Sequence, residues 1–294
     1  MKTDKILAQP SRVLSQDQRS FFFDQGYQIA PGLIEEVWLA RLNEAIGRLI
    51  ERSRALSASD GVFDLEEGHC AEAPRLRRIA FLDDLDPLFW EFARDSVMAD
   101  LAADVVGPDV VFREIMINFK WAGGGQAVKW HQDIPFYPHT NLSPTQFLVF
   151  LGDVTAEQGA LTVVPESHKG PIFEHYDEND HWIGAIPDHK LGEISLDRAV
   201  ELTGSAGTVT LHHSATVHGS APNLSDQGRP VLILGYNAAD ARPYTAPAYP
   251  SSHDGTLVRG QPAKYAHHEA VTLRLPPDWS TGYSSIFEYQ APGS

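Results

Sequence analysis

The first third of the chain carries apolar residues at helical spacing. Over residues 35–56 they recur every three or four positions with charged residues between them, which predicts a long helix with one buried face. The same spacing over residues 87–106 stops at a Gly-Pro pair and predicts a second helical stretch. A shorter helix is predicted over residues 15–26, which begin with a capping-box pattern and end at glycine. Residues 57–74 are rich in Gly, Ser, Asp and Glu, so we expect a loop there.

The pattern changes after Pro108, where short runs rich in β-branched and aromatic residues follow one another. Gly, Pro, Asn and Asp separate these runs, and no helical pattern lies between successive ones. Strands arranged in this way usually pair antiparallel, so we expect a β-barrel or sandwich. The predicted strands are 110–121, 147–151, 161–164, 207–211 and 230–236.

One domain is the expected organisation, because 294 residues, 43% of them hydrophobic, can bury a single sizeable core. Within it we expect a helical lead-in over residues 15–106 and a β-rich core over about 108–240. The last segment, 241–294, contains several prolines and then a short apolar run, which indicates an extended tail that packs on the core.

Charge and cysteine content narrow the range of partners and compartments. The formal net charge of −16 disfavours phosphate backbones and anionic lipid surfaces, so we expect neither nucleic acid nor a membrane as a partner. It also gives a weak bias against a polyanionic substrate such as an acyl-CoA. The only cysteine, Cys70, cannot form an intramolecular disulfide, and the N-terminus has no apolar run of signal-peptide length. We therefore expect a cytoplasmic protein that acts on a small molecule.

The motif Trp130-His131-Gln132-Asp133 holds two side chains that can bind a metal ion. In a strand, residues two apart project from the same face, so His131 and Asp133 would point the same way. Two histidines and one carboxylate leave three positions of an octahedral metal open, as a metal that binds both dioxygen and a co-substrate requires. A single H-x-D triplet is common by chance, so the motif needs a third ligand elsewhere.

A candidate third ligand lies in the later segment GTVTLHHSATVHGSAPNLSDQGRPVLILGY. His218 is favoured by its HGS context, and the competing interpretations place His212 or His213 there in another strand register. Turn formers after His218 allow the chain to fold back and bring Arg229 beside it. The guanidinium of Arg229 can hold a carboxylate of a dicarboxylic co-substrate with two hydrogen bonds, and the hydroxyl of Ser220 can donate a third.

With these residues in place, the chain resembles the phytanoyl-CoA dioxygenase family of iron(II)/2-oxoglutarate oxygenases. Three motifs carry the resemblance in the family's order, over roughly residues 15–238: WHQD, GALTVVPESHKGP and HGSAPNLSDQGRP. The resemblance implies a mainly β fold with flanking helices, whose core is a double-stranded β-helix (a cupin-like jelly roll). It implies iron(II) binding by His131, Asp133 and His218, and 2-oxoglutarate binding by Arg229. The segments SQDQRSFFFDQGYQIAPGLI and RLRRIAFLDDLDP resemble the helical lead-in of the family.

Two positions refine the comparison with the family. Glu166 stands in PESH where the family usually has glycine, which affects the local turn but none of the expected ligands. Asp133 is a carboxylate, whereas related halogenating enzymes have a small residue in its place. The resemblance therefore implies hydroxylation rather than halogenation, with dioxygen as the oxidant and succinate and carbon dioxide as co-products.

Several other residues have both a functional and an ordinary structural interpretation. Lys120 can point inward and bind the co-substrate or extend along the surface, and Thr162 can offer a hydroxyl or simply pack in its strand. His168 is expected to fix a loop at the barrel mouth rather than to bind the metal. Residues that could wall the pocket or bind an anionic substrate, or be ordinary core and surface, are Trp130, Phe136, Arg75, Arg77 and Arg78.

The expected reaction is oxidation of an unactivated carbon of a small metabolite, for example in secondary metabolism. A metal-dependent hydrolase or isomerase with the same three ligands is the first alternative, but it leaves Arg229 without a role. The second alternative is a catalytically silent barrel that serves as a binding module, and the presence of all three ligands argues against it.

Overall fold

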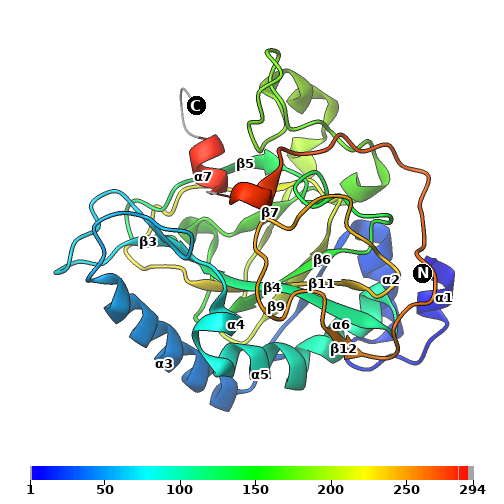
Figure 1. Cartoon of the computed structure of the whole chain (residues 1–294), viewed down its shortest axis with the longest axis horizontal. Coiled ribbons are helices and arrows are strands. Elements are labelled where there is room, and N and C mark those ends of the chain that lie inside the picture. Colours follow the sequence, from blue (N-terminus) through cyan, green and yellow to red (C-terminus); the bar gives the residue numbers. More distant parts are fainter. Residues whose placement is uncertain (1, 284, 291–294) are drawn as a thin grey trace.

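The computed structural model of the chain, which describes residues 2–283 and 285–290, contains two antiparallel β-sheets (Figure 1). Side chains from both sheets line one cavity, so the sheets face each other. The antiparallel β core predicted from the strand pattern is thus confirmed. The larger sheet has the order β1 (Tyr27–Ala30), β9 (Val209–His213), β6 (Thr145–Phe150), β11 (Val231–Ala238), β4 (Val110–Asn118), β3 (Leu76–Ile79) and β2 (Phe63–Leu65), with β12 (Leu257–Arg259) also paired to β4. The smaller sheet has the order β5 (Val128–His131), β10 (His218–Ser220), β7 (Leu161–Val163) and β8 (Val200–Leu202).

Helices of the lead-in lie along the outer face of the larger sheet (Figure 1). The long predicted helix is α3 (Glu36–Ser53), and the predicted stretch 87–106 is divided into α5 (Pro87–Asp95) and α6 (Met98–Val106). These two helices are separate because Ser96 has an extended backbone and its hydroxyl accepts a hydrogen bond from the backbone N–H two residues on. The other helices are α1 (Thr3–Leu7), α2 (Gln16–Gln25), α4 (Leu82–Leu85) and α7 (Ile286–Tyr289), with short 3-10 helices η1 (Ala156–Gln158), η2 (Ser167–Lys169), η3 (Asp188–Glu193), η4 (Leu196–Arg198) and η5 (Trp279–Thr281).

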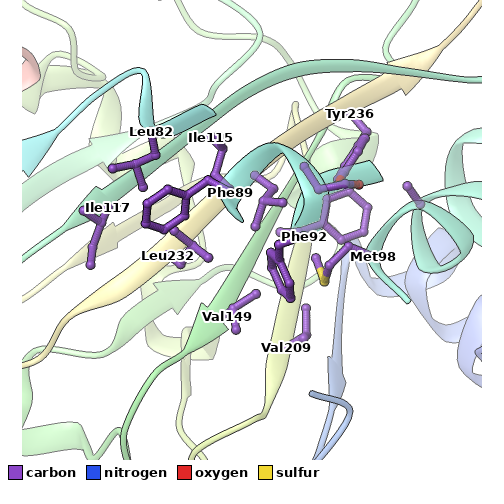
Figure 2. Close-up of a cluster of buried hydrophobic side chains, with 14 of the residues drawn as sticks. Leu82, Phe89, Phe92, Met98, Ile115, Ile117, Val149, Val209, Leu232 and Tyr236 are labelled. Atoms are coloured by element: carbon purple, nitrogen blue, oxygen red, sulfur yellow. The ribbon is translucent and has the colours of Figure 1, made fainter. Parts of the chain in front are cut away.

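The main hydrophobic core lies between these helices and the larger sheet (Figure 2). Ile115 and Ile117 of β4 point to this side, where they meet Phe89 and Phe92 of α5. Tyr236 of β11 is also buried there, and its hydroxyl donates a hydrogen bond to a carbonyl of α5 at 2.7 Å. Because side chains alternate along a strand, the opposite face of the same strands is left to line the cavity.

Two predictions for the lead-in are wrong. The segment RLRRIAF, expected to be helical, contains the strand β3, because Leu76 and Ile79 are buried in the core while Arg78 faces the cavity. The predicted loop over residues 57–74 contains β2, which pairs with β3. Contacts with the rest of the sheet therefore decide the conformation of both segments, rather than their local composition.

The predicted helix over residues 15–26 begins and ends as expected. The hydroxyl of Ser15 accepts a hydrogen bond from the backbone N–H of Gln18, whose side chain accepts one from the backbone N–H of Ser15. Gly26 ends the helix with a φ of +82°, a left-handed conformation that glycine adopts without strain. The turn before this helix is held by the buried Asp104, whose carboxylate accepts the backbone N–H groups of residues 12–14 at 2.7–2.8 Å.

Replacement of Asp104 by alanine should destabilise the protein by about 2–3 kcal/mol, because three backbone N–H groups would lose their acceptor. Urea unfolding followed by circular dichroism measures this change in the free energy of unfolding. The exposed Asp197 of η4 is a matched control, and Asp197→Ala should leave the unfolding midpoint nearly unchanged. Equal midpoints for the two variants would show that Asp104 does not hold the turn.

The described part of the C-terminal tail leads from β12 to α7, which lies beside β5 (Figure 1). Polar contacts attach it to the barrel: the indole N–H of Trp279 donates to the carbonyl of Phe136 at 3.1 Å, and the hydroxyl of Ser285 donates to Asp64 at 2.6 Å. Tail residues that line the cavity include Tyr283, Ile286 and Phe287. In the part of the chain that the structure describes, no helix is long and apolar enough to cross a membrane.

Candidate active site

Three side chains with metal-binding atoms meet where the smaller sheet faces the cavity. His131 ends β5 and His218 begins β10, and the two residues are direct partners in these antiparallel strands. Asp133 follows His131 by two residues, and its backbone N–H donates to the carbonyl of Ser214 at 2.9 Å. The ligand atoms of the three side chains all lie within 4.8 Å of one another. A single ion can therefore contact all three.

Backbone hydrogen bonds fix the tautomer of both histidines. Nδ1 of His131 lies 2.8 Å from the carbonyl oxygen of Lys129, and Nδ1 of His218 lies 2.9 Å from that of Thr216. A carbonyl only accepts, so each Nδ1 carries the proton and each Nε2 presents a lone pair. These Nε2 atoms lie 3.9 and 3.6 Å from Oδ1 of Asp133. Two nitrogen donors and one oxygen donor thus converge in the set that suits iron(II).

The charge states of these residues favour a bound cation. Burial lowers the pKa of His131 and His218, so both imidazoles are neutral and able to donate a lone pair near neutral pH. Burial works against ionisation of Asp133 as well, but the neighbouring His218 and the hydrogen bond from His212 outweigh it and lower its pKa. The site therefore holds one carboxylate charge and two neutral nitrogen ligands, and the residues present fit a divalent metal.

His212, the alternative to His218 as third ligand, lies beside the proposed ligands and contacts one of them. Its Nε2 donates a hydrogen bond to Oδ2 of Asp133 at 2.9 Å, which leaves Oδ1 facing the other two histidines. The adjacent His213 points the opposite way and packs near Phe22, as alternation along β9 requires. The contact of His212 with Asp133 could not be predicted from the sequence, because it depends on the position of β9 beside the segment that contains Asp133.

A cluster of positive charge occupies one end of the cavity. The ammonium group of Lys120 donates to the hydroxyl of Ser220 at 2.8 Å and to the carbonyl of Ala221. Arg229 lies next to it, since the backbones of Lys120 and Arg229 exchange hydrogen bonds at 2.8 and 3.1 Å. Both side chains are buried and line the cavity, and Nε of Arg229 has no hydrogen-bond partner among the described residues.

No acidic side chain offsets this charge in the described part of the structure. Burial lowers the pKa of Arg229 to about 10, and burial together with the charge of Arg229 lowers that of Lys120 to about 7. Two buried cations without an acid between them cost free energy unless an anion is bound. The geometry therefore fits a carboxylate that Lys120, Arg229 and Ser220 hold together.

The structure does not bring Thr162 to this site. Leu161 of β7 lines the cavity, so the next residue of the strand points to the other side, and the hydroxyl of Thr162 lies 3.4 Å from the carbonyl of Ala160. Among the described residues that line the cavity, Thr162 is therefore absent. Of the two aromatic candidates, Phe136 lines the cavity, whereas Trp130 packs in a separate apolar cluster.

The remaining candidates also take distinct places. Arg78 lines the cavity, whereas Arg75 and Arg77 form ion pairs with acidic residues outside it. Nε2 of His168 hydrogen bonds to the carbonyl of Phe23 at 3.0 Å, so this histidine ties its loop to α2.

The cavity between the sheets has a volume of about 430 Å³. Its floor consists of side chains from β4, β6, β9 and β11 of the larger sheet, and the metal-binding candidates face them from the smaller sheet. Several polar residues of this floor were missed by sequence analysis, because they carry no motif and their orientation depends on strand register. They are Arg113, Glu114, Gln146 and Asn237.

Comparisons with known proteins show the family of the chain. The family model described as Phytanoyl-CoA dioxygenase (PhyH) matches residues 22–231. A probable alpha-ketoglutarate-dependent hypophosphite dioxygenase of Stutzerimonas stutzeri is 29% identical over 285 residues, which are 93% of this chain and 96% of that protein. An L-proline trans-4-hydroxylase of Streptomyces griseoviridis is 32% identical over 214 residues, which are 66% of this chain and 78% of that protein.

A solved structure supports the fold. The crystal structure of EctD from S. alaskensis with bound Fe matches with a TM-score of 0.70 and 23% identity, over 87% of this chain and 90% of that one. The expected double-stranded β-helix is therefore confirmed.

Proposed function

The chain belongs to the phytanoyl-CoA dioxygenase family, and from this we propose that it binds iron(II) through His131, Asp133 and His218 and hydroxylates a small-molecule metabolite. It is an iron(II)- and 2-oxoglutarate-dependent dioxygenase, and its relatives are named as a probable alpha-ketoglutarate-dependent dioxygenase and as a hydroxylase. The observation that carries the site assignment is the pairing of two features in one cavity. Three convergent metal-binding atoms face it, and two uncompensated cations lie at one end.

Iron(II) and 2-oxoglutarate together supply the oxygen activation that converts a C–H bond to an alcohol, with release of succinate and carbon dioxide. The residues of the chain bind and orient these groups. We assign the distal carboxylate of 2-oxoglutarate to Arg229, Lys120 and Ser220. Leu148, Ile233 and other apolar side chains line the cavity beside it and keep water away from the co-substrate.

His212 has a positioning role in this assignment. It holds Oδ2 of Asp133, so that Oδ1 stays available to the metal. Partners of this kind orient the metal ligands, and their loss typically lowers metal affinity or activity about 10- to 100-fold.

The natural partners of the enzyme follow from the same features. We infer that it acts on a free small molecule in the cytoplasm and binds neither nucleic acid nor membranes. The net charge of −16 supports this inference, because it repels phosphate backbones and anionic lipid surfaces.

The test of the proposed function is co-substrate turnover by the purified, iron-reconstituted protein. We expect succinate to form from 2-oxoglutarate in step with oxygen consumption, and to form faster when a panel of small metabolites contains the substrate. Protein that holds iron but never converts 2-oxoglutarate would instead support a hydrolase, an isomerase or a binding module.

The affinity for 2-oxoglutarate should depend on pH through Lys120. The pKa of this lysine is about 7 in the free protein, and a bound carboxylate raises it, so the complex holds the proton more tightly. Affinity should therefore fall as pH rises above about 7, by up to about tenfold per pH unit. Calorimetric titration between pH 6 and 9 measures this slope, and Lys120→Met should remove it. The same slope in Lys120→Met would show that another group is responsible.

A further inference from the structure

A β-bulge in β4 creates a second polar group in the cavity. The pairing of β11 with β4 shifts by one residue, so that Gly235 faces Glu114 while Tyr236 faces Phe112. Arg113 is the extra residue, and as a result both Arg113 and Glu114 line the cavity. A bulge next to a binding site typically redirects side chains in this way.

The guanidinium of Arg113 is packed closely against three neighbouring residues. Its Cζ is 3.8 Å from the ring centroid of Tyr137, and its Nη2 donates to Oε1 of Glu114 at 2.5 Å. On its other side lies Gly235, where an added Cβ would come within 2.6 Å of Nη2 and 3.0 Å of Nε. The absence of a side chain at Gly235 therefore makes room for this arginine on the floor of the cavity.

This pair is connected to the proposed metal site across the sheet. Glu114, Gly235, Gln146 and His212 are successive partners on four adjacent strands. The amide of Gln146 donates to Oε1 of Glu114 at 2.8 Å, and His212 contacts Asp133 at the other end of the row. Both ends of this row line the same cavity, so the Arg113–Glu114 pair and the proposed metal site can face one bound molecule.

The balance of charge here differs from that around Lys120. Arg113 lines this part of the cavity together with the acids Glu114 and Asp254. Buried polar atoms without a partner among the described residues include a donor, Nε of Arg113, and an acceptor, Oε1 of Gln146. A lining that carries both signs is complementary to a ligand that carries both signs, whereas a simple anion or cation leaves one charge uncompensated.

We propose that the Arg113–Glu114 pair binds the primary substrate and that this substrate is a small dipolar ion of the amino-acid class. Its acidic group binds Arg113, and its ammonium group binds Glu114. This inference rests on the proposed function, because it assumes that the other end of the cavity holds 2-oxoglutarate. The cavity of about 430 Å³ must hold both 2-oxoglutarate and the substrate. The substrate is therefore a small free metabolite.

The test is binding of free L-amino acids to the iron-reconstituted, 2-oxoglutarate-loaded protein without oxygen, measured by thermal shift and calorimetry. Each amino acid is compared with the acid that lacks its amino group and the amine that lacks its carboxylate, such as L-valine with 3-methylbutanoate and 2-methylpropylamine. We expect at least one amino acid to bind, and its two analogues to bind at least about tenfold more weakly. An acid that binds as well as its amino acid, or a panel without any ligand, would overturn the substrate class.

Variants test the location of the site. Arg113→Gln and Gly235→Ala, which displaces the guanidinium, should each weaken amino-acid binding at least about tenfold and leave 2-oxoglutarate affinity unchanged. Arg41→Gln, at an exposed ion pair with Glu91, is the charge-matched control. Unchanged amino-acid binding in both cavity variants would overturn the location. A variant that still binds 2-oxoglutarate is folded. If the unaltered protein does not bind 2-oxoglutarate, the proposed function is refuted, whatever the result with amino acids.

Discussion

We expect Asp133→Ala to remove iron binding and to lower succinate formation by more than about 100-fold. Loss of a partner that only orients a ligand typically costs about 10- to 100-fold, and loss of the ligand itself should cost more. Asp133 also supplies the only carboxylate within the group of three metal-binding side chains. Without it, two neutral imidazoles remain, and they hold a divalent ion much less tightly.

Iron content after anaerobic reconstitution and succinate release measure the effect of Asp133→Ala. The exposed Asp188 of η3 provides the matched control, and Asp188→Ala should retain both iron and turnover. Full iron-dependent turnover by Asp133→Ala would show that the carboxylate is not a ligand.

The second large effect is expected for Arg229→Gln, which should raise the KM for 2-oxoglutarate about 10- to 100-fold. A hydrogen bond to a charged group contributes about 1.5–3 kcal/mol, which corresponds to this range of affinity. Lys120 and Ser220 remain in the variant, so binding is weakened rather than lost. The value of kcat at saturating 2-oxoglutarate should change much less, because Arg229 does not touch the proposed metal ligands.

Steady-state kinetics at varied 2-oxoglutarate concentration test this expectation. Arg48→Gln, on α3, is a suitable control because its guanidinium pairs with Glu44 and Asp86, which lie outside the cavity. An unchanged KM in Arg229→Gln would remove Arg229 from the co-substrate site.

The long helices and the strands β4, β6, β7, β9 and β11 could be predicted from the sequence, because their apolar spacing is set by burial on one side. Four candidate site residues could also be predicted from motifs: His131, Asp133, His218 and Arg229, which the structure gathers around one cavity. At these positions the residue type itself indicates the role, since few residue types can bind a metal or hold a carboxylate.

The remaining features depend on contacts between distant segments. The register of β7 turns Thr162 away from the cavity, and the bulge opposite Gly235 turns both Arg113 and Glu114 toward it. A shift of one residue exchanges the two faces of a strand, so no local pattern predicts these orientations. The position of the tail also depends on distant contacts. Tyr283 lines the cavity next to side chains from strands far away in the sequence.

The most direct test of the proposed active site is anaerobic titration of the iron(II)-loaded protein with 2-oxoglutarate, followed by visible absorption. We expect a weak charge-transfer band to grow and saturate at one equivalent of 2-oxoglutarate, and to be absent in Asp133→Ala. Iron-loaded protein that develops no band on addition of 2-oxoglutarate would contradict chelation of the co-substrate at His131, Asp133 and His218.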